Sequence, residues 1–140
     1  MATASTLPEF GPDATPYWAD ACRHLVKRDR VLKKIIPQYP GVALQSRGDA
    51  FVTLARSIVG QQISVKAAQS VWDRFESLTR KMTPAQVLKL KVDDMRGAGL
   101  SARKVEYLVD LALHFADKRV RVTDWPQMDD EAIIAELVAI

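Results

Sequence analysis

The sequence has 140 residues, is 48% hydrophobic and carries a formal net charge of +3. This length suffices for one domain with its own core, and the apolar fraction excludes an intrinsically disordered chain. No apolar run approaches the ~20 residues that a membrane-spanning helix needs, so we expect no membrane partner. The single cysteine, Cys22, cannot form an internal disulfide, which favours a cytoplasmic protein.

The charge is unevenly spread along the chain. Residues 121–140 hold one of the 20 basic residues and five of the 17 acidic ones, which leaves residues 1–120 with a balance of +7. Such a balance favours a phosphate-rich partner. A solvated basic surface is the alternative, and charge alone favours that alternative.

The first third of the chain predicts a flexible arm and two helices. Residues 1–14 are rich in Ala, Thr and Pro without apolar periodicity, which is typical of a flexible N-terminal arm. We expect Thr15 to cap a first helix, because threonine is a good N-cap and Pro16 fits the first turn. A second short helix should follow Asp29 and stop at Pro37, before a loop that runs to residue 48.

Two consecutive amphipathic helices follow the loop. Asp49 should cap the first, in which Phe51 and the residues after it match the i, i+3, i+4, i+7 pattern. Gly60 should end this helix in the left-handed conformation that glycine adopts without steric cost. Ser64 should cap the next helix.

Three further helices complete the expected fold. Their predicted N-caps are Thr83, Ser101 and Asp129 or Asp130, and Gly97 and Gly99 separate the first two of them. The stretch 118–126 is expected to be a loop. The sequence therefore predicts an all-α fold of seven or eight short helices over residues 15–140. The last helix has no end signal before Ile140, so we expect the natural sequence to continue.

Two segments carry polar residues where a core would not need them. Gln61 and Gln62 lie in the tight turn between the amphipathic helices, and each amide needs hydrogen-bond partners if it is buried. Gly99, Ser101 and Lys104 stand at a helix N-terminus, which suits a phosphate or another anion. For each segment alone, an ordinary polar turn or helix start is the favoured alternative.

Together, the two segments resemble a known family. The stretch FVTLARSIVGQQISVKAAQSVWDRF, in which Ser64 is followed 35 residues later by GLSARKVEYL, resembles the DNA-3-methyladenine glycosylase II group of the helix-hairpin-helix glycosylases. The resemblance covers about residues 15–140. It implies an all-α helix-hairpin-helix DNA glycosylase fold, truncated before the hairpin. It also implies base-excision repair of duplex DNA that contains alkylated bases such as 3-methyladenine, without a metal or another cofactor.

The resemblance also implies site residues. In this family the elbow after the first long helix enters the minor groove, and one side chain fills the gap left by the flipped base. The match assigns that role to Gln62, with Ser64 beside it and Gln61 in support. Lys66 is a candidate phosphate contact, and Ser101 and Lys104 are expected DNA-binding residues of the second segment.

The resemblance supplies no catalytic residue within these 140 positions. The family's glycine-rich hairpin and essential aspartate are expected after Ile140, so the chain alone should be inactive. The nearest acidic residues, Asp124, Asp129 and Asp130, are interpreted as loop and helix N-terminal residues.

Some aromatic and histidine residues have ordinary explanations. Core packing is the favoured interpretation of Trp72 and Tyr107, whereas Trp125 in a loop is expected to be more open. His24 and His114 have no metal-ligand spacing and are interpreted as structural or surface residues.

Two other functions remain as alternatives. A non-catalytic helical DNA-binding module would keep the Gln62 wedge and the basic surface. A helical protein-interaction bundle would make the DNA motifs coincidental. For the glycosylase, we expect a monomer.

Overall fold

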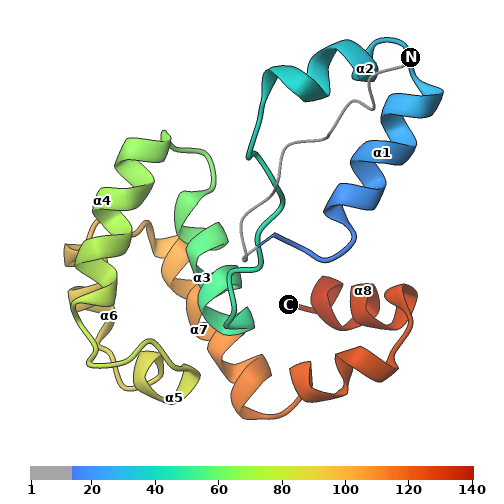
Figure 1. The fold of residues 1–140 in the computed structure, drawn as a ribbon. Coiled ribbons are helices and arrows are strands. Elements are labelled where there is room, and N and C mark those ends of the chain that lie inside the picture. The colour runs from blue at the N-terminus through green and yellow to red at the C-terminus, as the bar shows by residue number, and fades with distance from the viewer. Residues whose placement is uncertain (1–13) are drawn as a thin grey trace, which may run out of the picture. The chain divides into compact units, whose positions relative to one another are not determined.

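The computed structural model describes residues 14–140, and this part of the chain is helical, without strands (Figure 1). The expected all-α fold is confirmed. The chain divides into two compact units, 1–47 and 48–140, and each is described by itself. The expected flexible arm, residues 1–14, lies outside the described residues except for Ala14, which forms an isolated bridge with Gln45. No helix of the described chain is long and apolar enough to cross a membrane.

The first unit is a short helical hairpin. Its elements are α1 (Trp18–Arg28), α2 (Leu32–Ile35) and the 3-10 helix η1 (Ile36–Gln38). The Trp18 indole N–H donates to the Val42 carbonyl oxygen at 3.1 Å, which ties the returning chain to α1. The predicted helix start at Thr15 is wrong: the helix begins at Trp18, and the Thr15 carbonyl accepts from the Trp18 N–H in a preceding turn.

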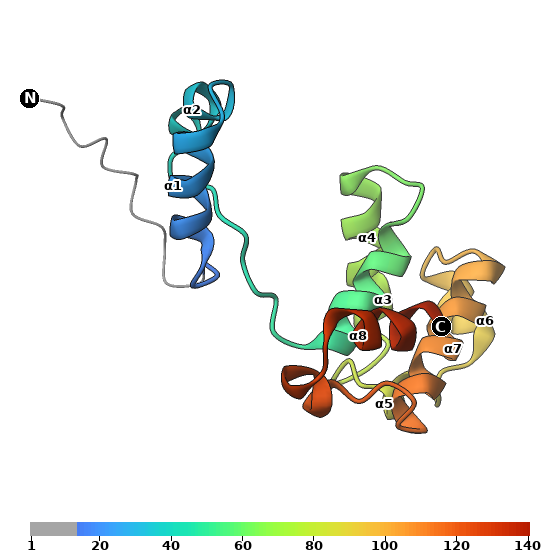
Figure 2. The same cartoon turned by 90° about the vertical axis from the view of Figure 1, so that its right-hand side faces the viewer.

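The second unit contains the main hydrophobic core. Its elements are α3 (Ala50–Gly60), α4 (Val65–Glu76), α5 (Pro84–Val87), α6 (Val92–Gly97), α7 (Ala102–Ala116), the 3-10 helix η2 (Val122–Gln127) and α8 (Asp130–Val138). Helix α7 packs against α3 and α5, and α3 packs against α4 (Figure 2). The largest fully buried side chains include Trp72, Phe75, Leu108 and Leu111, so the amphipathic faces seen in the sequence form this core.

Side-chain caps begin most of these helices, as the sequence predicts. The side chains that accept a backbone N–H at a helix start are Asp49, Ser64, Thr83, Ser101 and Asp129. Each cap leaves one fewer backbone N–H unpaired in the first turn. Helix α6 was not predicted, since its N-cap, Lys91, makes no side-chain cap hydrogen bond.

The turn after α3 differs from the prediction. Gly60 is the last helical residue and is not left-handed; the left-handed residue is Gln62, with φ +63°. A Cβ at Gly60 would lie 3.6 Å from the Ala68 Cβ, an ordinary contact. The expected left-handed Gly60 is therefore wrong, and the strained position is occupied by a glutamine. Gly99 also has a left-handed backbone, with φ +105°.

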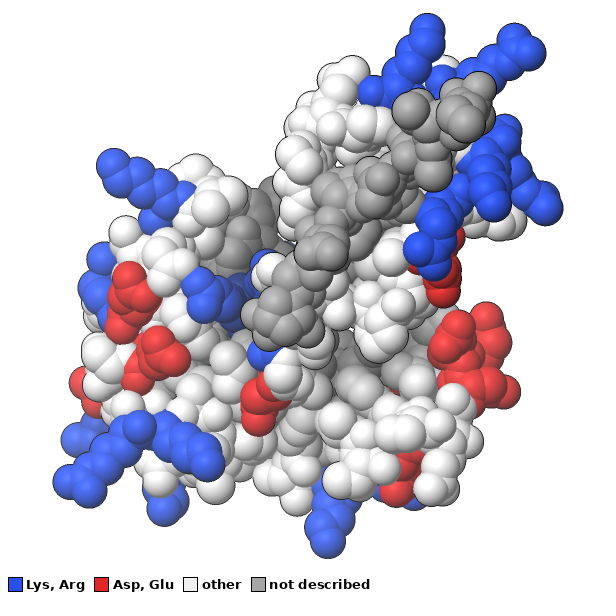
Figure 3. Space-filling view, in the orientation of Figure 1, with Lys and Arg blue, Asp and Glu red and all other residues white. Residues whose placement is uncertain are grey.

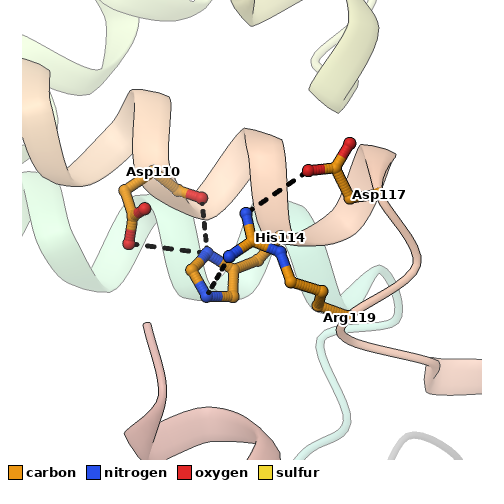
Figure 4. Close-up of polar contacts among 4 residues, drawn as sticks. All are labelled: Asp110, His114, Asp117 and Arg119. Atoms are coloured by element: carbon orange, nitrogen blue, oxygen red, sulfur yellow. Dashed lines mark hydrogen bonds and ion pairs between the residues drawn. The ribbon is translucent and has the colours of Figure 1, made fainter.

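Hydrogen bonds to the His114 ring and backbone fix the C-terminal end of α7 (Figure 4). Lys118 is left-handed at φ +57°, and the Lys118 and Arg119 N–H groups donate to the Phe115 and His114 carbonyl oxygens, which is a Schellman motif. The buried His114 ring lies 2.9 Å from the Asp110 carbonyl oxygen through Nδ1 and 3.3 Å from the Arg119 guanidinium through Nε2. His114 is thus structural, one of its two expected roles.

Glu136 anchors α8 to the preceding 3-10 helix. Its carboxylate accepts from the Trp125 indole N–H at 2.9 Å and from the Arg121 backbone N–H at 3.2 Å. These bonds, together with the Arg121 guanidinium 3.6 Å away, hold the pKa of Glu136 below its ordinary value of 4.5. Trp125, expected to be open, is half-buried against this carboxylate.

We expect Lys118→Gly to stabilise the protein by about 1 kcal/mol, because glycine adopts the left-handed conformation without steric cost. Urea unfolding measures the change. Lys118→Ala is the matched control, since it removes the same side chain but keeps a Cβ, and it should not stabilise. Equal effects of the two variants would contradict the assignment of strain to this backbone position.

We expect the stability contributed by Glu136 to depend on pH. Because the folded-state pKa is lowered, the contribution is complete well above pH 4.5 and is lost as the pH falls through the folded-state pKa. Glu136→Gln should therefore lower the Tm at pH 7, and its Tm should converge on that of the parent in acid. Glu106→Gln, an exposed change on α7, is the control. A Tm difference that is constant with pH would contradict this explanation.

Candidate nucleic-acid interface

The elbow between α3 and α4, residues 61–64, projects from the second unit. Gln61 leaves the helix in an extended conformation, Gln62 is left-handed, and Ser64 caps α4 through the Ala67 N–H at 3.2 Å. All four side chains are exposed. A left-handed non-glycine residue costs on the order of 1–3 kcal/mol and persists only where its surroundings hold it. The elbow therefore presents the Gln62 side chain to solvent from a strained, fixed backbone.

Lys104 is the residue that holds the elbow. Its ammonium donates to the carbonyl oxygens of Val59 and Gln61, both at 2.8 Å. The last carbonyls of a helix have no partner within the helix, and a cation also interacts favourably with the negative end of the helix dipole. Lys104 thus closes the C-terminus of α3 immediately before Gln62.

This contact changes the interpretation of the second segment. The sequence predicts Lys104 as a DNA-binding residue, but two of its three N–H donors bind the elbow. Ser101 accepts from the Lys104 backbone N–H at 3.2 Å and so begins the helix that positions this lysine. Ser101 and Lys104 are therefore brought to the elbow as its support. Gln61, Gln62, Ser64 and Lys66 all lie within residues 61–66, and the Lys66 side chain is exposed on the first turn of α4.

The turn before α7 is fixed to α4 as well. The Arg74 guanidinium donates through Nε to the Ala98 carbonyl oxygen at 2.9 Å. A Cβ at Gly99 would meet Arg74 Nη2 at 3.0 Å and Val71 Cγ2 at 3.2 Å, closer than nearly all real contacts. The backbone at φ +105° requires glycine, and the close approach of Arg74 and Val71 shows that the two sequence segments pack together at this point.

Two apolar residues beside Gln62 were not identified from the sequence as site residues. Ile63 is 40% exposed and Val65 is 89% exposed. Apolar side chains on both sides of a capping serine are what a surface needs to contact an apolar partner such as stacked bases. The sequence could have indicated these two site residues, because Ile63 and Val65 flank Ser64 in a turn where solvent exposure favours polar residues.

A cavity of about 480 Å³ lies beside the elbow. Its lining residues are Leu54, Ser57, Ile58, Gln61, Tyr107, Asp110, Leu111, Leu137 and Ile140. Tyr107 is 46% exposed, so its expected core position is wrong, whereas Trp72 is buried as expected. The Asp110 carboxylate lies 3.5 Å from His114 Nδ1. The cavity therefore combines apolar walls with one aromatic ring and one carboxylate.

The acidic residues near the C-terminus have local partners. Asp129 caps α8 through the Ala132 N–H at 2.8 Å, and Asp124 lies 3.6 Å from the Arg121 guanidinium. Across the described part of the chain, no group of three His, Cys, Asp or Glu residues could hold a metal ion.

Residues 55–138 match the family model described as the HhH-GPD superfamily base excision DNA repair protein. The chain belongs to this superfamily. The matched residues include the elbow, Lys104 and the cavity wall at Leu137. Membership confirms the resemblance at the level of the helix-hairpin-helix superfamily.

Curated relatives and solved structures agree with this assignment. The chain is 31% identical over 138 residues to the DNA-3-methyladenine glycosylase of Saccharomyces cerevisiae, over 84% of this chain and 45% of that protein. It is 29% identical over 84 residues to DNA-3-methyladenine glycosylase 1 of Schizosaccharomyces pombe, over 58% of this chain and 37% of that protein. The chain thus spans less than half the length of these relatives.

Two structures share the fold. The DNA-3-methyladenine glycosidase of Bacillus halodurans superposes with a TM-score of 0.71 at 31% identity, over 83% of this chain and 54% of that one. The 3-methyladenine DNA glycosylase of Schizosaccharomyces pombe, solved in complex with abasic DNA, gives a TM-score of 0.75 at 24% identity, over 86% and 62%. The helical glycosylase fold is therefore confirmed.

We expect Lys104→Met to loosen the last turn of α3, because the Val59 and Gln61 carbonyls lose their donor. Stability should fall by roughly 1–3 kcal/mol. The amides of Val59, Gly60 and Gln61 should exchange with solvent faster than in the parent, as measured by hydrogen exchange.

Arg103→Met is the matched control, because Arg103 is the exposed neighbour of Lys104 and its substitution removes the same charge. It should leave both quantities unchanged. Unchanged exchange at the end of α3 in Lys104→Met would show that the lysine does not hold the elbow.

Proposed function

We propose that this chain is the N-terminal part of a DNA glycosylase of the DNA-3-methyladenine glycosylase II type. The enzyme hydrolyses the N-glycosidic bond of alkylated bases such as 3-methyladenine in duplex DNA. One observation carries the proposal: an exposed glutamine, Gln62, is held in a left-handed conformation in the elbow. The Lys104 ammonium supports this elbow by donating to the Val59 and Gln61 carbonyl oxygens. Two curated relatives of the chain, in Schizosaccharomyces pombe and Saccharomyces cerevisiae, are named DNA-3-methyladenine glycosylases, which supports the proposal.

Gln62 is the proposed intercalating wedge. A base that is turned out of the stack leaves a gap, and its former partner loses its hydrogen bonds. A glutamine is long and flat, and its amide can donate to and accept from the orphaned base. The exposed Ile63 and Val65 would add apolar contact beside it, and Gln61, Ser64 and Lys66 are exposed next to them as supporting contacts.

The rigid elbow suits this role physically. A flexible loop would lose conformational entropy each time it entered the groove, whereas a pre-formed elbow does not. Ser64 accepts a hydrogen bond from its own helix, and its hydroxyl hydrogen remains available to DNA. Strain at Gln62 is stored before binding, which is common at functional sites.

The catalytic aspartate is proposed to lie beyond Ile140, after a glycine-rich hairpin. It would stabilise the positive charge that develops on the sugar and help to activate water. The 140-residue chain should then bind DNA as a monomer but release no base. The non-catalytic DNA-binding module is the second candidate. Base release by a polypeptide that includes the following segment would separate the two, since the module would release none.

We expect Gln62→Gly to raise stability by about 1 kcal/mol and to lower affinity for an abasic duplex by about tenfold, equivalent to roughly 1.4 kcal/mol. The substitution relieves the backbone strain but removes the wedge. Calorimetric unfolding and fluorescence anisotropy with an abasic duplex measure the two effects.

Lys118→Gly is the matched control, because it relieves the same strain at the other left-handed non-glycine position in the described chain. It should stabilise without changing affinity. Equal affinities of the Gln62→Gly variant and the parent for the abasic duplex would defeat the wedge assignment.

A further inference from the structure

The positive charge of the chain gathers on the first unit. Residues 1–47 hold seven basic and four acidic side chains, a balance of +3, and the seven basic residues and two of the acidic ones lie within residues 14–47; residues 48–140 hold 13 of each. The family match, residues 55–138, lies within the neutral unit. The net attraction of the described chain for a polyanion therefore belongs to the helical hairpin rather than to the unit that carries the elbow.

Most of this charge lies at one place, the connection between α1 and α2. We name it the basic turn, and its members are Lys27, Arg28, Arg30, Lys33 and Lys34. All five side chains are exposed. In Figure 3 blue side chains dominate the surface over α1 and α2.

The two acidic residues among residues 14–47 do not neutralise the basic turn. Asp20 forms an ion pair with Arg23, one helical turn before it. Asp29 uses its carboxylate to accept from the N–H groups of Val31 and Leu32 at 2.7 and 2.9 Å. No ion pair of the basic turn occurs among the described residues.

The folded state gains little from this arrangement. Cations in the last turn of a helix are stabilising by a few tenths of a kcal/mol to about 1 kcal/mol, which accounts for Lys27 and Arg28. Arg30 lies between the helices, and α2 has only four residues. Five like charges within eight residues repel one another, so a stabilising role does not explain the cluster.

We propose that the basic turn binds the phosphate backbone of duplex DNA outside the lesion. This inference rests on the proposed function, since it takes DNA as the partner. Lysine and arginine supply the charge and the forked donors that phosphates accept. Residues 27–34 contain no aromatic side chain, so the basic turn lacks the stacking platform that single-stranded nucleic acid requires. The contact is therefore with duplex phosphates and is independent of sequence and lesion.

The test compares DNA binding by the 140-residue chain and by two charge-matched variants. In the first variant all five members of the basic turn are changed to Gln. In the second, five exposed basic residues of the other unit are changed to Gln: Arg80, Lys81, Lys89, Lys91 and Arg96. Affinity for an undamaged and an abasic duplex is measured from 50 to 200 mM salt.

The basic-turn variant should bind both duplexes at least about tenfold more weakly, with the preference for the abasic duplex retained. Its slope of log affinity against log salt should be shallower by about 3–5, because each lost phosphate contact removes about 0.9. The second variant should keep most of the parent's slope. A variant with Lys27, Lys33 and Lys34 changed to Arg should bind like the parent.

Each failure has a distinct signature. If the parent binds neither duplex, the proposed function and this inference both fail. If the parent binds but the two Gln variants have equal slopes, only this inference fails. Tighter parent binding to single-stranded RNA or to vesicles with anionic lipid than to the duplex would also overturn it. Circular dichroism of the basic-turn variant, compared with the Arg variant, separates loss of binding from loss of folding.

Discussion

The elbow depends on one contact, between the Lys104 ammonium and the last carbonyls of α3. A helix end leaves carbonyl oxygens unpaired, and a left-handed residue that follows adds strain. Lys104, which lies more than 40 positions further along the chain, donates two charge-assisted hydrogen bonds of 2.8 Å to these carbonyl oxygens. This contact explains why the two sequence segments belong together: the first forms the projecting elbow, and the second carries the residue that holds it.

Further contacts near the elbow fix the positions of its neighbouring segments. Arg74 joins α4 to the turn before α7, and Gly99 lets the two approach closely. Gln62 is thus a strained residue in an elbow whose two helices are both fixed by hydrogen bonds, α3 by Lys104 and α4 by Arg74. Glycine would relax this position but would carry no side chain. A glutamine at a left-handed position indicates that the side chain matters more here than the backbone energy.

Local interactions were predictable from the sequence, and distant ones were not. The caps Asp49, Ser64 and Ser101 depend on neighbours three residues away, so the sequence predicts them. The left-handed Gln62 depends on a tertiary contact, and the rule that glycine ends helices wrongly selected Gly60 instead. Lys104 was recognised as a site residue, but its role required the fold, because a sequence does not show which carbonyls an ammonium meets.

Charge and shape are divided between the two units. The second unit is neutral and carries the rigid elbow, whose contacts are directional. The first unit carries the net positive charge of the chain, +3 over residues 1–47, and the attraction of such charge for phosphate is long-ranged and non-specific. For the proposed glycosylase, contacts with undamaged duplex would have to be weak and tolerate movement, which non-directional charge contacts allow. Of the two lysines that the sequence predicts as DNA contacts near the elbow, Lys104 is already bound to carbonyl oxygens and Lys66 is exposed. On the proposed function, the charge of the basic turn would set residence on DNA, whereas the directional contacts of the elbow would respond to a base that leaves the stack.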